Sequence, residues 1–264
     1  MLQICNVHKV FNPGTVNEKI ALKGVELHLK PGDFVTVIGG NGAGKSTMLN
    51  CVAGVFPVDG GKILIDGVDV TKLPEYKRAK FIGRVFQDPM MGTAATMQIE
   101  ENLALAARRG QFRGLSSGIS KAEREEYKKQ LQILDLGLEE RLTAKVGLLS
   151  GGQRQALTLL MATLQKPKLL LLDEHTAALD PKTAEKVLTA TQRIVEKDNL
   201  TTLMITHNMR DAIAYGNRLV MMYDGRIVVD VSGEEKKKLT VEQLLALFSQ
   251  ASGSDEVSDK LVLS

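Results

Sequence analysis

The sequence predicts an α/β fold with a core of parallel strands, a preceding antiparallel β-layer and an inserted α-helical subdomain. Three observations carry this prediction. Residues 2–11 and 25–30 alternate apolar and polar side chains, as antiparallel strands with one solvated face do. The run from Leu169 to Leu172 is continuously apolar, which is typical of a parallel strand buried on both faces. Between residues 90 and 147, helical patterns replace strand patterns.

The composition narrows the classes of protein that the chain can belong to. A length of 264 residues suffices for one large domain, with or without an inserted subdomain. Cys5 and Cys51 lie in apolar segments without CxxC or Cys/His spacing, which predicts buried thiols in a reducing compartment. We find neither a signal peptide nor an apolar run near the ~18 residues of a membrane span, so we expect a cytoplasmic protein. A net charge of +3, dispersed along the chain, argues against nucleic acid as a partner.

The segment from Asp33 to Leu49 reads D-F-V-T-V-I-G-G-N-G-A-G-K-S-T-M-L and contains G-x-x-x-x-G-K-S between a predicted strand and a predicted helix. This is the context of a P-loop, whose backbone N–H groups and helix dipole converge on a phosphate. Lys45 adds a cation for the β- and γ-phosphates, and the Ser46 hydroxyl is placed to bind Mg²⁺. The expected nucleotide contacts of the loop are Gly39, Asn41, Gly42, Ala43, Gly44, Lys45, Ser46 and Thr47. The core is therefore predicted to be that of a P-loop NTPase.

Phe11 ends the first predicted strand, directly before the chain break at Asn12-Pro13-Gly14. With a nucleotide in the P-loop, an aromatic ring so close to the start of the domain could stack on adenine. Ordinary strand packing is the alternative, and this residue alone does not decide between the two.

After the P-loop, the pattern predicts helices over 46–53 and 74–80 and strands over 62–65 and 82–86. Gln87 follows the last of these strands. In an α/β protein, the carboxyl end of a strand is where ligands bind, so its amide is a candidate for Mg²⁺ coordination or for orienting water. A solvated loop side chain is the plainer interpretation.

The predicted insertion contains helices over 98–109 and 121–136, the second opened by a Ser120 and Glu123 capping box. We interpret the charges of the second helix as a solvated face in which Glu125 pairs with Lys129. The uncharged, methionine-rich segment 90–97 suits adaptable docking, and packing inside the insertion is the alternative.

A second glycine-rich helix start follows, at Leu149-Ser150-Gly151-Gly152-Gln153, and opens a helix through Gln165. Its free backbone N–H groups and serine hydroxyl again suit an anion. Because the chain's own nucleotide occupies the first site, the natural occupant of the second is a triphosphate held by another copy. This predicts a head-to-tail dimer with isologous symmetry.

Two carboxylates end the apolar strand over 169–172. Asp173 is placed to hold Mg²⁺ through water, as a Walker-B aspartate does, and Glu174 is placed to polarise water for attack on the γ-phosphate. Asp180 and Pro181 begin the next helix, to Lys197, as N-cap and first residue. Capping leaves Asp180 available for a second contact across a dimer interface.

His207 ends a further buried strand predicted over 201–206. A lone histidine is usually structural, but this one emerges at the same edge as Gln87 and Glu174, where it could hydrogen-bond the γ-phosphate. A helix over 209–215 is expected to follow.

Asp224-Gly225 predicts a type I′ hairpin between strands 218–223 and 226–231. Thr240 and Gln243 form a capping box for a helix to Phe248, and the end of the chain from Ser252 is expected to be loosely ordered.

Together these motifs resemble the ATP-binding subunit of ABC transporters over nearly the whole chain. They occur in the family order: Walker A at Gly39 to Ser46, Q-loop Gln87, signature Leu149 to Gln153, Walker-B Asp173 with catalytic-type Glu174, D-loop Ala178 to Asp180, and switch His207. The resemblance implies ATP and Mg²⁺ as cofactors, an adenine-stacking Phe11, and an integral-membrane permease that docks near Gln87 to Met97. It also implies a separate solute-binding protein and a location on the inner face of the cell membrane through the permease.

We divide the chain on this basis into an ABC ATPase domain, 1–232, and a C-terminal helix with a flexible tail, 233–264. The first comprises a RecA-like core, 1–89 and 156–232, and a helical subdomain at about 90–155.

One residue departs from the family pattern, because His175 stands where proline usually follows the catalytic glutamate. Histidine restores a backbone N–H and adds a group that titrates near neutral pH, which would tune the catalytic loop. A neutral variant of a subgroup is the alternative. Subunits with D-E-H-T resemble those of bacterial amino-acid-type uptake systems.

The first functional hypothesis is an ATPase that dimerises on a permease and drives solute transport, with import favoured over export and amino acids as a candidate cargo. The second is a soluble ABC ATPase of the iron–sulfur-assembly or repair type, although the insertion is too short for the coiled coil of a repair protein. The third is a nucleotide-dependent scaffold with little turnover.

Overall fold

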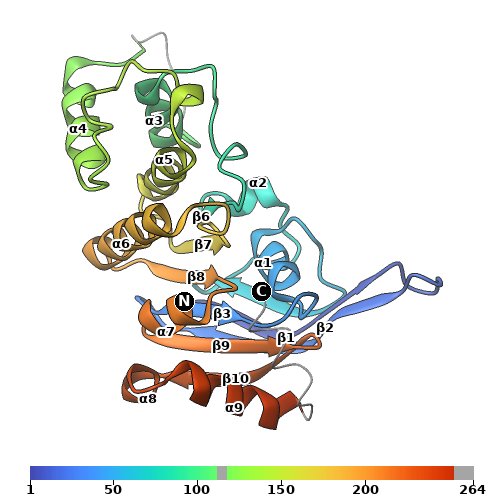
Figure 1. Ribbon diagram of the computed structural model, residues 1–264. Coiled ribbons are helices and arrows are strands. Elements are labelled where there is room, and N and C mark those ends of the chain that lie inside the picture. Colours follow the sequence, from blue (N-terminus) through green and yellow to red (C-terminus); the bar gives the residue numbers. More distant parts are fainter. Residues whose placement is uncertain (112–117, 253–264) are drawn as a thin grey trace.

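The computed structural model describes residues 1–111 and 118–252 and has a mixed α/β fold built on two sheets (Figure 1). The strands are β1 (Leu2–Phe11), β2 (Lys19–Leu29), β3 (Phe34–Ile38), β4 (Gly60–Ile65), β5 (Val68–Asp69), β6 (Ile82–Val85), β7 (Leu169–Asp173), β8 (Thr201–Ile205), β9 (Arg218–Tyr223) and β10 (Arg226–Ser232). The helices are α1 (Lys45–Ala53), α2 (Glu75–Arg78), α3 (Ile99–Ala107), α4 (Lys121–Gln132), the 3-10 turn η1 (Val146–Leu148), α5 (Gly151–Thr163), α6 (Pro181–Asp198), α7 (Met209–Ala214), α8 (Gly233–Lys237) and α9 (Val241–Ser252). The predicted α/β fold class is confirmed.

The larger sheet of the described chain has six strands in the order β10-β9-β3-β8-β7-β6, and all neighbours except β9 and β10 run parallel. Its central strands consist of apolar runs because helices cover both faces; Leu169 to Leu172 are completely buried. Parallel strands end at one common edge of a sheet. The residues that follow β3, β6, β7 and β8 therefore emerge along this edge, where α/β proteins bind ligands.

The smaller sheet has four strands within the described chain, in the order β2-β1-β4-β5. Alternate residues of β1 and β2, such as Leu2, Ile4 and Val25, face inward and join the apolar cluster around α1. The predicted second strand was too short, because β2 begins at Lys19, which pairs with Phe11. Figure 1 shows the β1–β2 hairpin extending beyond the body of the molecule.

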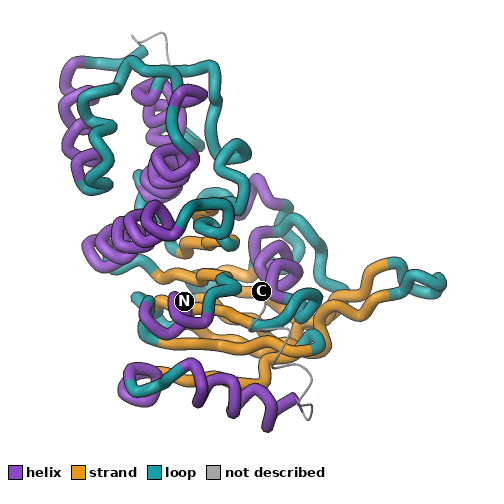
Figure 2. Tube along the Cα trace, viewed as in Figure 1, coloured by secondary structure: helices purple, strands orange, loops and turns teal. Residues whose placement is uncertain are grey.

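Helices α3 and α4 gather at one end of the molecule, and α8 and α9 lie at the opposite end (Figure 2). In α4, Tyr127 and Leu131 are buried one turn apart while most of the charged residues face solvent. The predicted pair of Glu125 and Lys129 was wrong, since Glu125 accepts from Lys128 at 3.3 Å. This helix ends at Gln132, four residues before the predicted Leu136.

The C-terminal segment continues the larger sheet. Asp224 and Gly225 both have positive φ, 44° and 74°, as the predicted type I′ turn requires. Helix α8 was not predicted; its Lys236 is buried and donates to the carbonyls of Ile213, Tyr215 and Gly216 at the end of α7. The tail expected to be loosely ordered, 253–264, lies outside the described residues. Among the helices of the described ranges, none is long and apolar enough to cross a membrane.

Candidate nucleotide-binding site

The glycine-rich loop between β3 and α1 folds tightly because its glycines adopt conformations that other residues rarely reach. Gly39 has a φ of 149°, and a Cβ there would overlap the carbonyl oxygen of Met222. Gly44 has a φ of 101° and caps α1 without any side-chain hydrogen bond. The backbone N–H groups at the start of α1 therefore have no side-chain acceptor, which is the arrangement of an anion site.

A pocket of about 340 Å³ opens in front of this loop. It is lined by Phe11, Lys19, Ala21, Asn41, Gly42, Ala43, Gly44, Lys45, Ser46, Thr47 and Glu174. The structure thus brings together the predicted aromatic residue, most of the predicted loop residues and the predicted catalytic carboxylate. Sequence reasoning missed Lys19, because the start of β2 was not recognised.

The Lys45 side chain is buried against the loop that precedes it. Its ammonium donates to the carbonyls of Gly39 at 2.7 Å and Gly40 at 3.2 Å. Burial lowers the pKa of Lys45, while the nearby charges of Glu174 and Asp173 oppose this effect. A cation is therefore held at the floor of the pocket with two carboxylates near it.

Glu174 lies just beyond β7 in a left-handed backbone conformation, with a φ of 44°. Its N–H donates to the carbonyl of Ile205 at 3.0 Å, which ties this turn to the end of β8. His207 follows β8, and its Nδ1 lies 4.0 Å from Oε2 of Glu174. His207 thus approaches the predicted catalytic carboxylate, although only Glu174 lines the pocket.

The predicted metal ligands are Ser46, Gln87 and Asp173. They offer a hydroxyl, an amide and a carboxylate, which are oxygen donors of the kind that Mg²⁺ prefers. Burial raises the pKa of Asp173, and the charge of Arg84 opposes this shift. Gln87 is exposed beyond the end of β6, at the same sheet edge but outside the pocket lining. In the described ranges there is no group of three or more His, Cys, Asp or Glu residues that could hold a metal ion.

Phe11 is half-buried at the rim of the pocket. Its ring meets that of Phe56 edge-on, with centroids 5.3 Å apart at 84°, and Lys9 Nζ lies 5.4 Å from its centroid. The ring is thus supported from the protein side and borders the pocket as well, so the structure is compatible with both interpretations of Phe11.

The signature residues form a separate feature at the start of α5. Ser150 Oγ accepts from the Gln153 N–H at 3.3 Å, and Gln153 Oε1 accepts from the Ser150 N–H at 3.2 Å. Gly152 is buried so tightly against Thr183 that a Cβ would overlap the threonine methyl group, and Gly151 lies against Leu179. Asp180 accepts from the Thr183 N–H at 3.1 Å. Ser150 to Gln153 therefore neighbour the Asp180 segment, but these residues do not line the pocket of their own chain.

His175 is buried, with 2% of its surface exposed, beneath the turn that carries Glu174. Its Nε2 lies 3.2 Å from Oγ1 of Thr191, which itself donates to the carbonyl of Val187. Because the single hydroxyl proton is thus engaged, the histidine Nε2 must be the donor. Burial lowers the pKa of His175 to about 4. The expectation of a group titrating near neutral pH was therefore wrong for the folded chain.

Arg84 is a further residue near the site that sequence reasoning missed. Its Nη2 lies 3.6 Å from Oδ2 of Asp173. The available signal was a positive charge inside the short apolar strand Ile82–Val85, for which strand patterning alone gives no reason.

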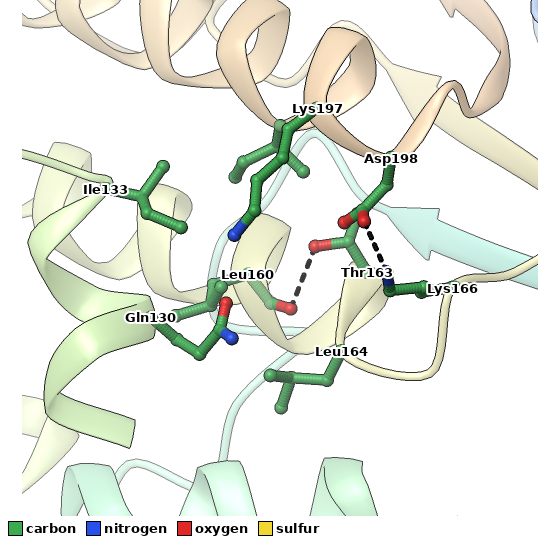
Figure 3. A pocket seen from close by; sticks show the side chains of 9 residues that line it. Gln130, Ile133, Leu160, Thr163, Leu164, Lys166, Lys197 and Asp198 are labelled. Atoms are coloured by element: carbon green, nitrogen blue, oxygen red, sulfur yellow. Dashed lines mark hydrogen bonds and ion pairs between the residues drawn. The ribbon is translucent and has the colours of Figure 1, made fainter. Parts of the chain in front are cut away.

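A second cavity, of about 90 Å³, lies where α4 approaches α5 and α6 (Figure 3). Lys166 pairs with Asp198 at 2.6 Å beside it, and the Thr163 hydroxyl donates to the carbonyl of Leu160. None of the predicted site residues lines this cavity. Its volume is also far below that of a nucleotide site.

The fold and the pocket define a class of protein. The sequence profile described as ABC transporter matches residues 22–177, more than half of the chain. The chain therefore belongs to the ABC transporter family; it is an ATP-binding subunit of that family and an ATPase, as the resemblance implied.

Individual relatives place the chain within this family. It is 44% identical to the tyrosine transport ATP-binding protein of Clostridioides difficile, over 95% of this chain and 100% of that protein. It is 38% identical to the methionine import ATP-binding protein MetN of Rhizobium johnstonii, over 79% of this chain, and spans about half of that protein's length, 56%. Among solved structures, the dimeric ATP-binding cassette MJ0796 bound to ADP and Pi superposes with a TM-score of 0.74 at 31% identity, covering 88% of this chain and 98% of that one.

Proposed function

We propose that this chain binds MgATP and hydrolyses it as a head-to-tail dimer on a separate membrane permease, and thereby drives solute import. One observation carries the proposal: the glycine-rich loop and Glu174 share one pocket, whereas the signature start of α5 lies outside that pocket. A single copy therefore holds two halves of a reaction centre in two different places.

Within the pocket, Lys45 and the backbone N–H groups of the loop bind the phosphates, and Phe11 stacks on adenine. Ser46, Asp173 and Gln87 would hold Mg²⁺, which would supply positive charge against the phosphates. Glu174 accepts a proton from the attacking water. His207, 4.0 Å from Glu174, hydrogen-bonds the γ-phosphate.

The second copy contributes Ser150, Gly151, Gly152, Gln153 and Asp180. The N–H groups of Gly151 and Gly152 precede the first intrahelical hydrogen bond of α5 and are free to bind an anion. The related cassette MJ0796 is dimeric when bound to ADP and Pi, which supports a dimer as the working form.

The permease docks near Gln87 to Met97. Met90 and Met91 are 50% and 68% exposed there, an adaptable apolar surface. Arg154, in the first turns of α5, contacts Met90 Sδ and donates to the carbonyl of Gly147. The docking segment is thus joined to the signature helix. Docking on the permease would place the protein on the inner face of the cell membrane.

The cargo follows only from the relatives, which are named for tyrosine transport and for methionine import. We propose an amino acid as the solute, delivered by a separate binding protein. For the chain itself we retain the division into a RecA-like core (1–89 and 156–232), a helical subdomain (about 90–155) and a C-terminal segment (233–264). The boundary near 155 falls within α5.

The test compares Glu174→Gln with the double variant Glu174→Gln, Ser150→Arg. The single variant should bind ATP, lose hydrolysis and migrate as a dimer with MgATP in size-exclusion chromatography. The double variant should bind ATP equally well and stay monomeric. The large side chain that Ser150→Arg introduces would fill the space that the phosphate of the partner's nucleotide needs. Dimerisation of both would overturn the head-to-tail site, and unchanged turnover in Glu174→Gln would favour the scaffold. Co-purification with a multi-span membrane protein separates transport from a soluble role.

A further inference from the structure

Arg84 makes an unusual set of contacts for a residue in a core strand. Its side chain is only 13% exposed, and Nη2 donates to Oδ1 of Asn50 at 2.7 Å. The same Nη2 lies 3.6 Å from Oδ2 of Asp173, and Nη1 lies 3.9 Å from Oε1 of Glu75. The guanidinium carbon is 4.6 Å from the ring centroid of Phe86. One cation thus touches a helix, two acidic groups and the residue before Gln87.

The register of the sheet explains how Arg84 reaches these groups. Arg84 pairs with Leu171 of β7, and Asp173 is two residues further along that strand, on the same face. Leu171 belongs to the apolar cluster that contains α1, so this face of the sheet is the one that α1 covers. Asn50 of α1 accepts a hydrogen bond from the guanidinium and so anchors it on the side of the sheet that α1 covers. The Arg84 side chain therefore lies between Asn50 of α1 and Asp173.

The energetic cost of burying Arg84 favours a specific role for this side chain over simple packing. Nε of Arg84 is buried without a hydrogen-bond partner, which is an unfavourable arrangement. Arginine is also a costly residue to bury when an apolar side chain would fill the same space. The guanidinium is stacked and held by Asn50, so it presents a fixed charge to the carboxylate. Fixed partners of this kind orient metal-binding carboxylates in other proteins.

We propose that Arg84 is a positioning residue that orients the Asp173 carboxylate for the divalent cation of the nucleotide site. The proposal rests on the proposed function, in which Asp173 holds Mg²⁺. Arg84 approaches Oδ2 and restricts rotation of the carboxylate, which leaves the second oxygen for the cation. Through Phe86 it also steadies the segment that leads into Gln87, another of the expected ligands.

A purely electrostatic role for Arg84 makes the opposite prediction. If the guanidinium only neutralised Asp173, its removal would make the site more negative, and a divalent cation would bind more tightly. If Arg84 positions the carboxylate, its removal weakens cation binding despite the gain in negative charge. The sign of the change therefore distinguishes the two roles.

The experiment titrates Mn²⁺ into the protein saturated with ADP and follows free Mn²⁺ by electron paramagnetic resonance. Arg84→Met keeps the apolar stem and should weaken Mn²⁺ binding by about 10-fold, as loss of an orienting partner typically does. ADP affinity measured in EDTA should change by less than about twofold, because the phosphate loop is untouched. Arg84→Lys, which retains charge but not the planar fork, should recover only part of the Mn²⁺ affinity.

Arg78→Met is the matched control. Arg78 is 1% exposed and donates to backbone carbonyls, including those of Cys51 and Leu73. Its loss should lower thermal stability and leave Mn²⁺ affinity unchanged. Should Arg84→Met fail to fold, Asn50→Ala removes the anchor of the guanidinium and should weaken Mn²⁺ binding about threefold.

The variant Asp173→Asn distinguishes failure of the positioning role of Arg84 from failure of the proposed metal site. If it abolishes Mn²⁺ binding while the Arg84 and Asn50 variants bind as tightly as wild type or more tightly, the positioning role of Arg84 is refuted and the proposed function stands. If Asp173→Asn itself leaves Mn²⁺ binding unchanged, Asp173 is no metal ligand and the proposed metal site fails.

Discussion

The starts of α1 and α5 are both glycine-rich turns that expose backbone N–H groups, yet they differ in every surrounding feature. Gly44 caps α1 without a side-chain hydrogen bond, and the pocket around it includes Lys45 and Glu174 of the same chain. Ser150 caps α5 with its own hydroxyl, in a capping box that is exposed to solvent. The first turn is completed by its own chain and uncapped, ready for a ligand. The second has a side-chain cap that engages the Gln153 N–H group and leaves those of Gly151 and Gly152 free, so it becomes a binding site only when a partner brings an anion to it.

The largest effect that tests this contrast concerns the cation of the first turn. Replacing Lys45 by Met should lower kcat for ATP hydrolysis by about 100-fold or more, because the buried cation at the floor of the pocket, which would stabilise charge on the phosphates, is lost. Lys19→Met is the control, since Lys19 lines the same pocket but is exposed. It should change KM by only a few-fold. Equal losses in both variants would mean that the pocket responds to total charge and not to placement.

A second pair of variants compares the two turns through their glycines. Gly39→Ala should lower the free energy of unfolding by roughly 2–4 kcal/mol, since the new Cβ must avoid the Met222 carbonyl and the backbone is strained. Gly151 has an ordinary φ, and a Cβ there would lie 3.4 Å from Leu179. Gly151→Ala should therefore leave monomer stability within about 0.5 kcal/mol. Urea denaturation measures both. Comparable destabilisation would show that Gly151 is held as tightly as Gly39.

The third prediction concerns His175, which is buried next to Glu174 and donates to Thr191 of α6. Its folded pKa of about 4 is below the ordinary 6.5, so between these values the unfolded chain binds a proton that the folded chain does not. The free energy of unfolding should be unaffected by this group above pH 6.5 and should fall by up to ~3 kcal/mol as the pH drops towards 4. His175→Gln, which keeps a donor without titrating, should flatten this acid limb in urea denaturation.

The same neutrality has a consequence for activity. Because the ring stays uncharged above pH 6.5, His175→Gln should not displace the pH profile of ATP hydrolysis between pH 6.5 and 8.5. A displaced profile would show that His175 titrates in the working enzyme.

Local motifs were predictable from the sequence, and long-range contacts were not. The glycine loop, the signature turn and the Asp173 and Glu174 pair each carry their signal within a few residues, and the parallel strands follow from continuous apolar runs. Lys19 and Arg84 carry no such signal, because one depends on strand pairing with Phe11 and the other on the register of β6 with β7. Helix α8 is too short to show a period. That the signature turn lies apart from the pocket required the spatial structure.

The contacts of Lys236 bear on where the chain can be shortened. Its ammonium fastens three carbonyls at the end of α7, and beyond it Leu244 and Phe248 are completely buried in the cluster that includes Ile38 of β3. A chain terminated after Ser232 would leave those carbonyls to water and uncover the apolar side of the strand that leads into the phosphate loop. We therefore expect the last two helices of the described chain to unfold together with the catalytic core, as parts of one cooperative unit.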